Sequence, residues 1–185
     1  FSFDSDATLD MRYDRSSGPS AREVVNHCSE KDLADIIYRY GEERYSRQIA
    51  ASICRRRPVE TPRELADICK RIYARRSSGE TWRIHPATRT MMALRIYVNK
   101  ELEELEELLD TLPELMAPGG RVAVITYHSL EARRVKHTWR RQSREGLLDP
   151  IPPAPMMPSD EEVSENPRSR SAQLRAARIT EEVSQ

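Results

Sequence analysis

The chain has 185 residues, of which 38% are hydrophobic and 6 are glycine, and its 30 lysines and arginines balance its 30 aspartates and glutamates. This length suits one ordinary domain or two small ones. Zero net charge argues against a polybasic protein that holds nucleic acid by bulk charge, and no apolar run approaches the ~20 residues that cross a bilayer. The mean hydropathy is −0.72, yet apolar residues recur at regular spacing, which predicts a folded chain.

The first half of the chain reads as a helical bundle. Residues 1–19 are polar, rich in turn formers and without a helical period. Helix-start signatures follow, each a hydroxyl that caps a helix with an acidic residue three positions on: Ser20 with Glu23, Ser29 with Asp32, Thr61 with Glu64, and later Ser159 with Glu162. Together with the apolar spacing, they predict short helices and no strand over 20–27, 30–40, 42–56 and 62–75.

A loop over 75–83 leads to Pro86, which opens a long helical segment. Its apolar stripe consists of Leu94, Val98, Leu102, Leu105, Leu109 and Leu112. Because Pro113 ends the stripe before the three or four heptads that a coiled coil needs, we favour a helix packed in its own domain over a coiled-coil dimer.

The pattern changes after residue 120. The seven residues RVAVITY, 121–127, are β-branched and almost continuously apolar, which is typical of a strand buried on both faces of a parallel sheet. A basic helix follows His128 and Ser129, and the proline-rich segment 150–158 is predicted to be a loop or linker. A weak last strand is predicted within 174–179. This order is half of a doubly wound α/β unit, whose neighbouring strands must come from outside the chain.

Five segments in collinear order carry a family resemblance: LDMRYD (9–14), YGEERYSRQIA (40–50), HPATRTMMALRIYVNKEL (85–102), MAPGGRVAVITYHSLEARRVK (116–136) and NPRSRSAQLR (166–175). Together they resemble the RsmH/MraW family, which methylates the N4 amine of a cytidine in small-subunit (16S) ribosomal RNA with S-adenosylmethionine. The resemblance implies an α/β fold, namely the C-terminal half of a Rossmann-like class I methyltransferase with an inserted all-helical domain. Residues 1–19 would then be a remnant carrying the active-site loop, 20–84 the insert, and 85–185 the second half of the methyltransferase domain.

The glycines mark a departure from the family pattern. The chain has no GxGxxG and no glycine-rich strand-to-helix turn, so the cofactor-binding residues are expected upstream of Phe1. We therefore expect an N-terminally truncated chain that does not methylate by itself.

The resemblance places Asp10 beside the active site as a catalytic acceptor for the cytosine amine, with Arg12 holding a phosphate. The alternative is that the two side chains pair with each other or cap a turn. Reaching the amine requires an unpaired or flipped base.

Candidates also follow the 121–127 strand, because open α/β sheets bind ligands at the carboxyl ends of their strands. His128 is a candidate catalytic residue that contacts substrate, or alternatively it makes a structural hydrogen bond. Ser129 is expected to bind substrate or to cap the next helix, with Glu131 favourable in its first turn. Arg95 and Asn99 share a helix face and form either a substrate-binding pair or part of a solvated face.

Basic residues concentrate after residue 132, so the zero net charge hides a dipolar layout. The basic helix and the tail arginines, among them Arg168 and Arg170, are candidates for contacts with an RNA backbone, which fix position without reading sequence. The opposing interpretation is a solvated charged face.

Cysteines and histidines do not form a metal or disulfide pattern. They are Cys28, Cys54, Cys69, His27, His85, His128 and His137. With no CxxC pair and no ligand spacing, we expect no metal site and a cytoplasmic, reducing setting. A second class of function remains open, a non-catalytic RNA- or ribosome-binding helical protein. An exposed sheet edge would also predict a homodimer or aggregation.

Overall fold

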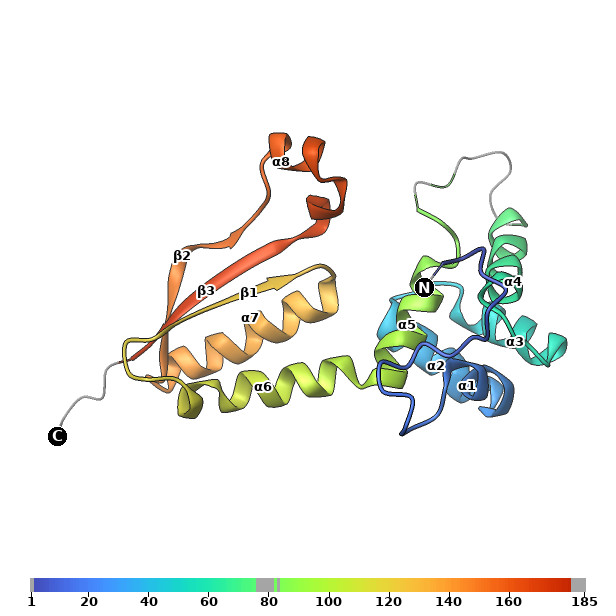
Figure 1. The fold of residues 1–185 in the computed structure, drawn as a ribbon, viewed down its shortest axis with the longest axis horizontal. Coiled ribbons are helices and arrows are strands. Elements are labelled where there is room, and N and C mark those ends of the chain that lie inside the picture. Colours follow the sequence, from blue (N-terminus) through green and yellow to red (C-terminus); the bar gives the residue numbers. More distant parts are fainter. Residues whose placement is uncertain (1, 76–81, 83, 181–185) are drawn as a thin grey trace. The chain divides into compact units, whose positions relative to one another are not determined.

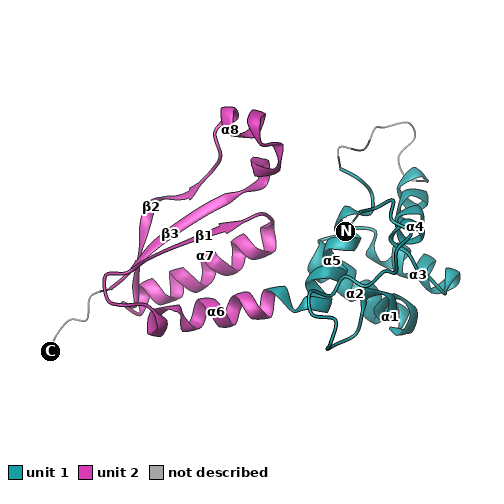
Figure 2. Ribbon diagram, in the orientation of Figure 1, with its two compact units in different colours: residues 1–101 teal, residues 102–185 magenta. Residues whose placement is uncertain are grey.

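The structure is a computed structural model, and it describes residues 2–75, 82 and 84–180. Figure 1 shows the elements, and Figure 2 shows that the chain divides into two compact units, residues 1–101 and residues 102–185. Each unit has its own hydrophobic cluster and is described by itself. Among the helices of the described residues, none combines the length and apolarity that a membrane span requires.

Unit 1 is helical. Its elements are α1 (Ala21–His27), α2 (Glu30–Gly41), α3 (Ser46–Arg56), α4 (Pro62–Ala74) and α5 (Thr88–Asn99). The predicted caps are present: the Ser20 and Thr61 side chains accept from the N3 amides and complete capping boxes, and Ser29 accepts from Asp32. The prediction of short helices without strands over 20–75 is confirmed.

The start of α3 differs from the predicted position. The prediction began this helix at 42, but Glu42 has a positive φ of 48° and caps α2, and α3 begins at Ser46. Glu43 explains the intervening turn, because this buried carboxylate accepts hydrogen bonds from the Tyr45 amide at 2.8 Å and the Tyr73 hydroxyl at 2.7 Å. A buried carboxylate needs such hydrogen-bond donors, and these bonds fix the non-helical turn between α2 and α3.

The long helical segment is two helices. Lys100 has a φ of 52° and separates α5 from α6 (Glu101–Leu115), so the predicted continuous stripe is broken there. The prediction that Pro113 ends the helix is also wrong. Pro113 has no amide to donate to the Leu109 carbonyl, and the buried Gln142 side chain donates to that carbonyl instead, at 2.7 Å.

Unit 2 contains a small sheet with helices on one face (Figure 1). Its elements after α6 are β1 (Arg121–Thr126), α7 (Ser129–Arg144), β2 (Leu148–Met156), α8 (Asp160–Glu165), the 3-10 helix η1 (Pro167–Ser171) and β3 (Gln173–Ile179). Within the described residues, the sheet has the order β1-β3-β2 and both pairings are antiparallel. The predicted last strand is confirmed.

The prediction of a strand buried on both faces of a parallel sheet is wrong for the described part of the chain. Val122 and Val124 pack on the core, whereas Ala123 and Ile125 are exposed. The core on the covered face consists of Leu109, Leu112, Val135, Trp139, Leu148, Ala177 and Ile179. The helices of unit 2 cover one face only, so β1 alternates in burial despite its apolar sequence.

The proline-rich segment is a strand rather than a loop or linker. Strand β2 pairs only with β3 and therefore lies at an edge of the described sheet. Proline has no N–H to donate to a ladder, and a strand at an edge tolerates this loss. Pro150 pairs in regular register with β3, whereas Pro152, Pro153 and Pro155 lie in the register shift between Ile151 and Met156, where the ladder is interrupted.

Candidate functional sites

The LDMR motif of unit 1 is fixed by its apolar residues. Leu9 and Met11 are buried at 0% and 2% exposure, and the Leu9 backbone donates to Glu60 O and accepts from Arg22 N. Asp10 and Arg12 are only partly buried. The two apolar side chains therefore anchor the motif in the core, while the two charged side chains stay partly accessible.

Asp10 and Arg12 form an ion pair. Arg12 Nε donates to Asp10 Oδ1 at 2.7 Å and Nη2 donates to Oδ2 at 3.2 Å, and the side chains are 18% and 20% exposed. This is the pairing that the sequence left as an alternative. Such a two-bond arrangement fixes both planar groups, so the carboxylate and the guanidinium have defined orientations.

Asn99 holds the backbone on both sides of Arg12. Its Oδ1 accepts from the Tyr13 amide at 2.8 Å, and its Nδ2 donates at 2.8 Å to both Met11 O and Arg95 O. Met11 has a φ of 66°, a conformation that costs a non-glycine residue about 1 kcal/mol or more. The side-chain clamp thus stabilises a strained turn that carries the Asp10–Arg12 pair.

Arg95 makes an internal ion pair on the same helix end. Its Nε and Nη2 donate to the two carboxylate oxygens of Glu101, at 2.7 and 2.9 Å, and the Tyr13 hydroxyl also contacts this carboxylate, at 3.4 Å. Sequence reasoning missed Glu101 and Tyr13. Glu101 opens a run of acidic residues, and that context conceals a specific partner.

The Arg12 guanidinium holds the pKa of the Asp10 carboxyl below its usual range, against an opposing effect of burial. Ionisation of Asp10 therefore stabilises the folded state. This contribution is fully present above the unfolded pKa near 3.8, and it is lost as the pH falls through the lower folded pKa. We expect D10N to lower the free energy of unfolding by about 0.5 kcal/mol at pH 6, as for a solvent-screened ion pair, and by less at pH 3. Urea unfolding of both proteins at the two pH values measures this, and an equal difference at both would contradict it.

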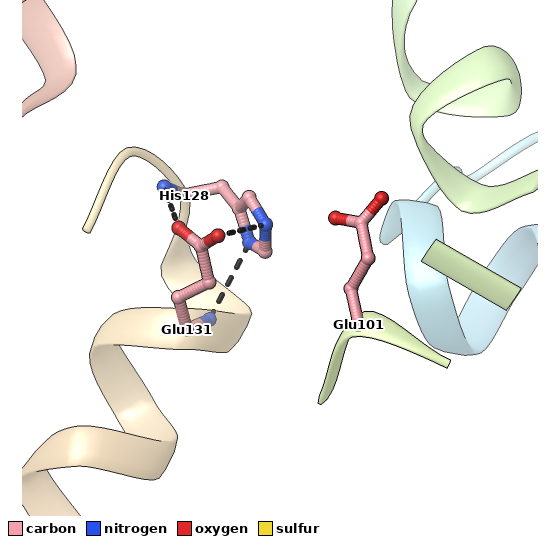
Figure 3. A group of neighbouring side chains, drawn as sticks. All are labelled: Glu101, His128 and Glu131. Atoms are coloured by element: carbon pink, nitrogen blue, oxygen red, sulfur yellow. Dashed lines mark hydrogen bonds and ion pairs between the residues drawn. The ribbon is translucent and has the colours of Figure 1, made fainter. Parts of the chain in front are cut away.

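His128 caps α7, where the sequence favoured Ser129. The Glu131 amide donates to His128 Nδ1 at 3.4 Å, and the Glu131 carboxylate accepts from the His128 amide at 3.3 Å (Figure 3). The same carboxylate also accepts from the Tyr127 amide at 2.9 Å. The signal that identifies this cap is the capping-box spacing. Glu131 lies three positions after His128, whereas the residue three after Ser129 is Ala132.

The His128 ring is held by Glu131 at both nitrogens. Its Nε2 lies 3.2 Å from Glu131 Oε1, and the His128 side chain is 12% exposed. Burial raises the pKa of Glu131, but the hydrogen bonds from His128 and the Tyr127 amide outweigh burial and leave that pKa below its usual range. The contacts therefore favour an ionised Glu131 that fixes the turn directly after β1.

Arg168 and Arg170 lie on η1 and are exposed. Between them, Ser169 is buried and donates to the Asn166 carbonyl at 2.8 Å. In the part of the chain that the structure describes, no hydrogen bond joins either arginine to His128. The two predicted groups are thus in one unit but do not form one cluster.

The described glycines do not form a cradle for an adenosyl cofactor. A Cβ on Gly41 would meet the Arg89 carbonyl, and a Cβ on Gly120 would meet the Ala117 carbonyl, so both are packed against protein backbone. Gly18 and Gly146 occupy tight turns with positive φ. These residues do not fit the glycine-rich loop that would bind the cofactor.

Comparison with known proteins identifies the family. The model of the MraW methylase family matches residues 1–180, and the chain belongs to this family. Three relatives, each named ribosomal RNA small subunit methyltransferase H, come from Koribacter versatilis, Cyanothece sp. and Nostoc punctiforme. They are 48%, 51% and 50% identical over 177, 177 and 178 residues. The alignments cover 96% of this chain but only 56%, 58% and 58% of the relatives, so the chain spans a little over half their length.

Proposed function

We propose that the chain is part of a methyltransferase that transfers a methyl group from S-adenosylmethionine to the N4 amine of a cytidine in small-subunit ribosomal RNA. The observation that carries this proposal is the family match over residues 1–180, together with ~50% identity to proteins named for small-subunit ribosomal RNA. The position of the methyl group on the base rests on the motif resemblance. A homodimer and a cytoplasmic location stay predictions.

Asp10 is proposed to accept a hydrogen bond from the cytosine amine as its lone pair is freed for attack. The carboxylate is ionised at neutral pH, and the Arg12 guanidinium lowers its pKa further; the ionised form is the one that accepts. Arg12 orients this carboxylate through Nε and Nη2, and its Nη1 donates to the Gly18 carbonyl. The remaining N–H groups of the guanidinium are proposed to bind a phosphate. Asn99 is proposed as a positioning residue, because it holds the backbone on both sides of Arg12.

His128 is proposed to position neighbouring residues and not to carry a proton. Both of its ring nitrogens contact Glu131, so we propose that it positions the end of β1, where substrate contacts from Ser129 are expected. Arg168 and Arg170 are proposed to contribute positive charge toward the RNA. The charge of Arg95 is balanced by its ion pair with Glu101, so Arg95 is proposed to bind substrate as a hydrogen-bond donor only.

The domain assignment is likewise a proposal: an inserted helical domain over 20–84, and a Rossmann-like half formed by 85–185 with the remnant 1–19. The strand-free region 20–75 and the β–α–β order of unit 2 support it. Helix α5 packs on α2, so the insert and the start of the second half share a core.

The test is methyl transfer by the polypeptide extended to the length of its relatives. Small subunits from cells lacking the activity are incubated with radiolabelled S-adenosylmethionine, and D10N is compared with D6N, which removes an exposed carboxylate paired with Arg63. We expect D10N to lower the rate at least 100-fold and D6N to leave it nearly unchanged. RNA binding without any transfer would instead support the non-catalytic alternative.

A further inference from the structure

The basic residues of α7 divide into two faces with different partners. Arg134 Nε lies 2.9 Å from Glu106, and Arg141 pairs with Asp110, so α6 neutralises one face. On the other face, Lys136, Arg140 and Arg144 are exposed, and within the described ranges no carboxylate lies within ion-pair distance of them. The sequence alone does not separate these faces, because cations occur on both.

The unpaired face borders a groove of about 330 Å³ in unit 2. The groove is lined by Lys136, Arg140, Arg144, Arg175 of β3, Trp139 and residues of β2 that include Pro150. None of the described lining residues is acidic. A groove lined by cations without counter-charges concentrates positive potential, which favours an anionic ligand.

Two buried donors at the groove have no acceptor. Trp139 is 3% exposed, and neither its Nε1 nor the Nε of Arg175 has a hydrogen-bond partner in the described part of the chain. An unmade hydrogen bond at a buried donor costs about 1 to 3 kcal/mol. Such donors in the lining of a cationic groove are a second, independent indication of a ligand that accepts hydrogen bonds.

We propose that this groove, the α7–β2 groove, binds the phosphodiester backbone of single-stranded RNA. Lys136, Arg140 and Arg144 recur every four residues, about 6 Å apart along the helix, a spacing close to that of consecutive phosphates on an extended strand. Arg175 and the Trp139 indole supply donors from the groove wall. The contacts hold the backbone and read no sequence.

This inference deepens the proposed function, since it rests on an RNA partner. Its test is binding without a methyl donor, so a failure of methyl transfer leaves it intact. A fluorescein-labelled single-stranded 12-mer of mixed sequence is titrated with the 185-residue chain, and anisotropy is followed from 50 to 300 mM KCl. The key variant is K136Q/R140Q, and the matched control R134Q/R141Q removes the same charge from the face that α6 neutralises.

We expect K136Q/R140Q to bind about tenfold more weakly and to lower the salt slope by about 1.4, because each lost phosphate contact on a single strand contributes about 0.7. The control is expected to change affinity less than threefold. Equal weakening by both variants would show bulk charge instead of a site and would overturn the proposal, as would equally tight competition by inorganic phosphate. All four positions are exposed or partly exposed, and thermal melts confirm folding.

The indole donor is tested by W139F, which replaces the indole with a smaller ring that has no N–H. Because Trp139 is buried in the core of unit 2, the melting temperature is expected to fall, and binding is measured well below it, where the variant is still folded. We expect about threefold weaker binding by the folded variant. Unchanged affinity would overturn the assignment of Trp139 as a donor.

Discussion

Replacing Gly41 with alanine is expected to lower the free energy of unfolding of unit 1 by about 2 kcal/mol. Gly41 ends α2 where it packs on α5, and a Cβ built there would lie 2.5 Å from the Arg89 carbonyl oxygen and 3.1 Å from Ala93 Cβ. Alanine favours a helix by about 1 kcal/mol over glycine. Overpacking against rigid backbone costs about 1 to 3 kcal/mol or more, so the steric cost exceeds the gain in propensity.

The control for this prediction is G18A. Gly18 also lies in unit 1, but a Cβ there meets no atom within 4 Å, and only its φ of 71° opposes alanine. We expect G18A to cost about 1 kcal/mol. Urea unfolding measured by circular dichroism compares the two. If G41A is as stable as the wild type, the close approach of α2 and α5 at Gly41 is wrong.

Local signals predicted the helical half well. Ser20, Ser29 and Thr61 cap helices through contacts that lie within four residues of each cap, so the sequence contains the whole arrangement. The start of α3 was missed because Glu43 is held by Tyr73, thirty residues away. The same limit explains Pro113, whose lost hydrogen bond is replaced by Gln142 from α7.

The apolar composition of β1 does not determine how many of its faces are buried. The run 121–127 predicts a strand, but burial of one or both faces depends on which elements cover it. The prolines of β2 are typical of a loop, and the sequence alone does not indicate that this segment forms a strand at the edge of a sheet. At the candidate sites, Asp10 and His128 were identifiable as residue types, and the pairing of Asp10 with Arg12 was one of the alternatives. The contacts of Asn99 with Met11 and Tyr13 could not be predicted, because they join residues more than 80 positions apart. Glu131 was assigned to the neighbouring cap.

Replacing Asn99 with alanine is expected to have the largest effect on the LDMR turn. The variant loses hydrogen bonds to the Tyr13 amide and to the Met11 and Arg95 carbonyls. At about 0.5 to 1.5 kcal/mol each, their loss lowers the free energy of unfolding by about 2 to 3 kcal/mol. Met11 has a positive φ that then lacks support on either side, so the turn is expected to open locally before unit 1 unfolds.

The matched control is N26A, because Asn26 makes a similar clamp on another loop. Its Nδ2 donates to the Val59 carbonyl at 2.9 Å, and its Oδ1 accepts from the Val59 amide at 2.8 Å. Hydrogen exchange followed by NMR separates the two variants. In N99A the Tyr13 amide is expected to lose at least tenfold of its protection, whereas in N26A it keeps its protection and only the Val59 amide exchanges faster. Protection of Tyr13 in N99A would mean that another contact holds the turn, and Asn99 would then not position the Asp10–Arg12 pair.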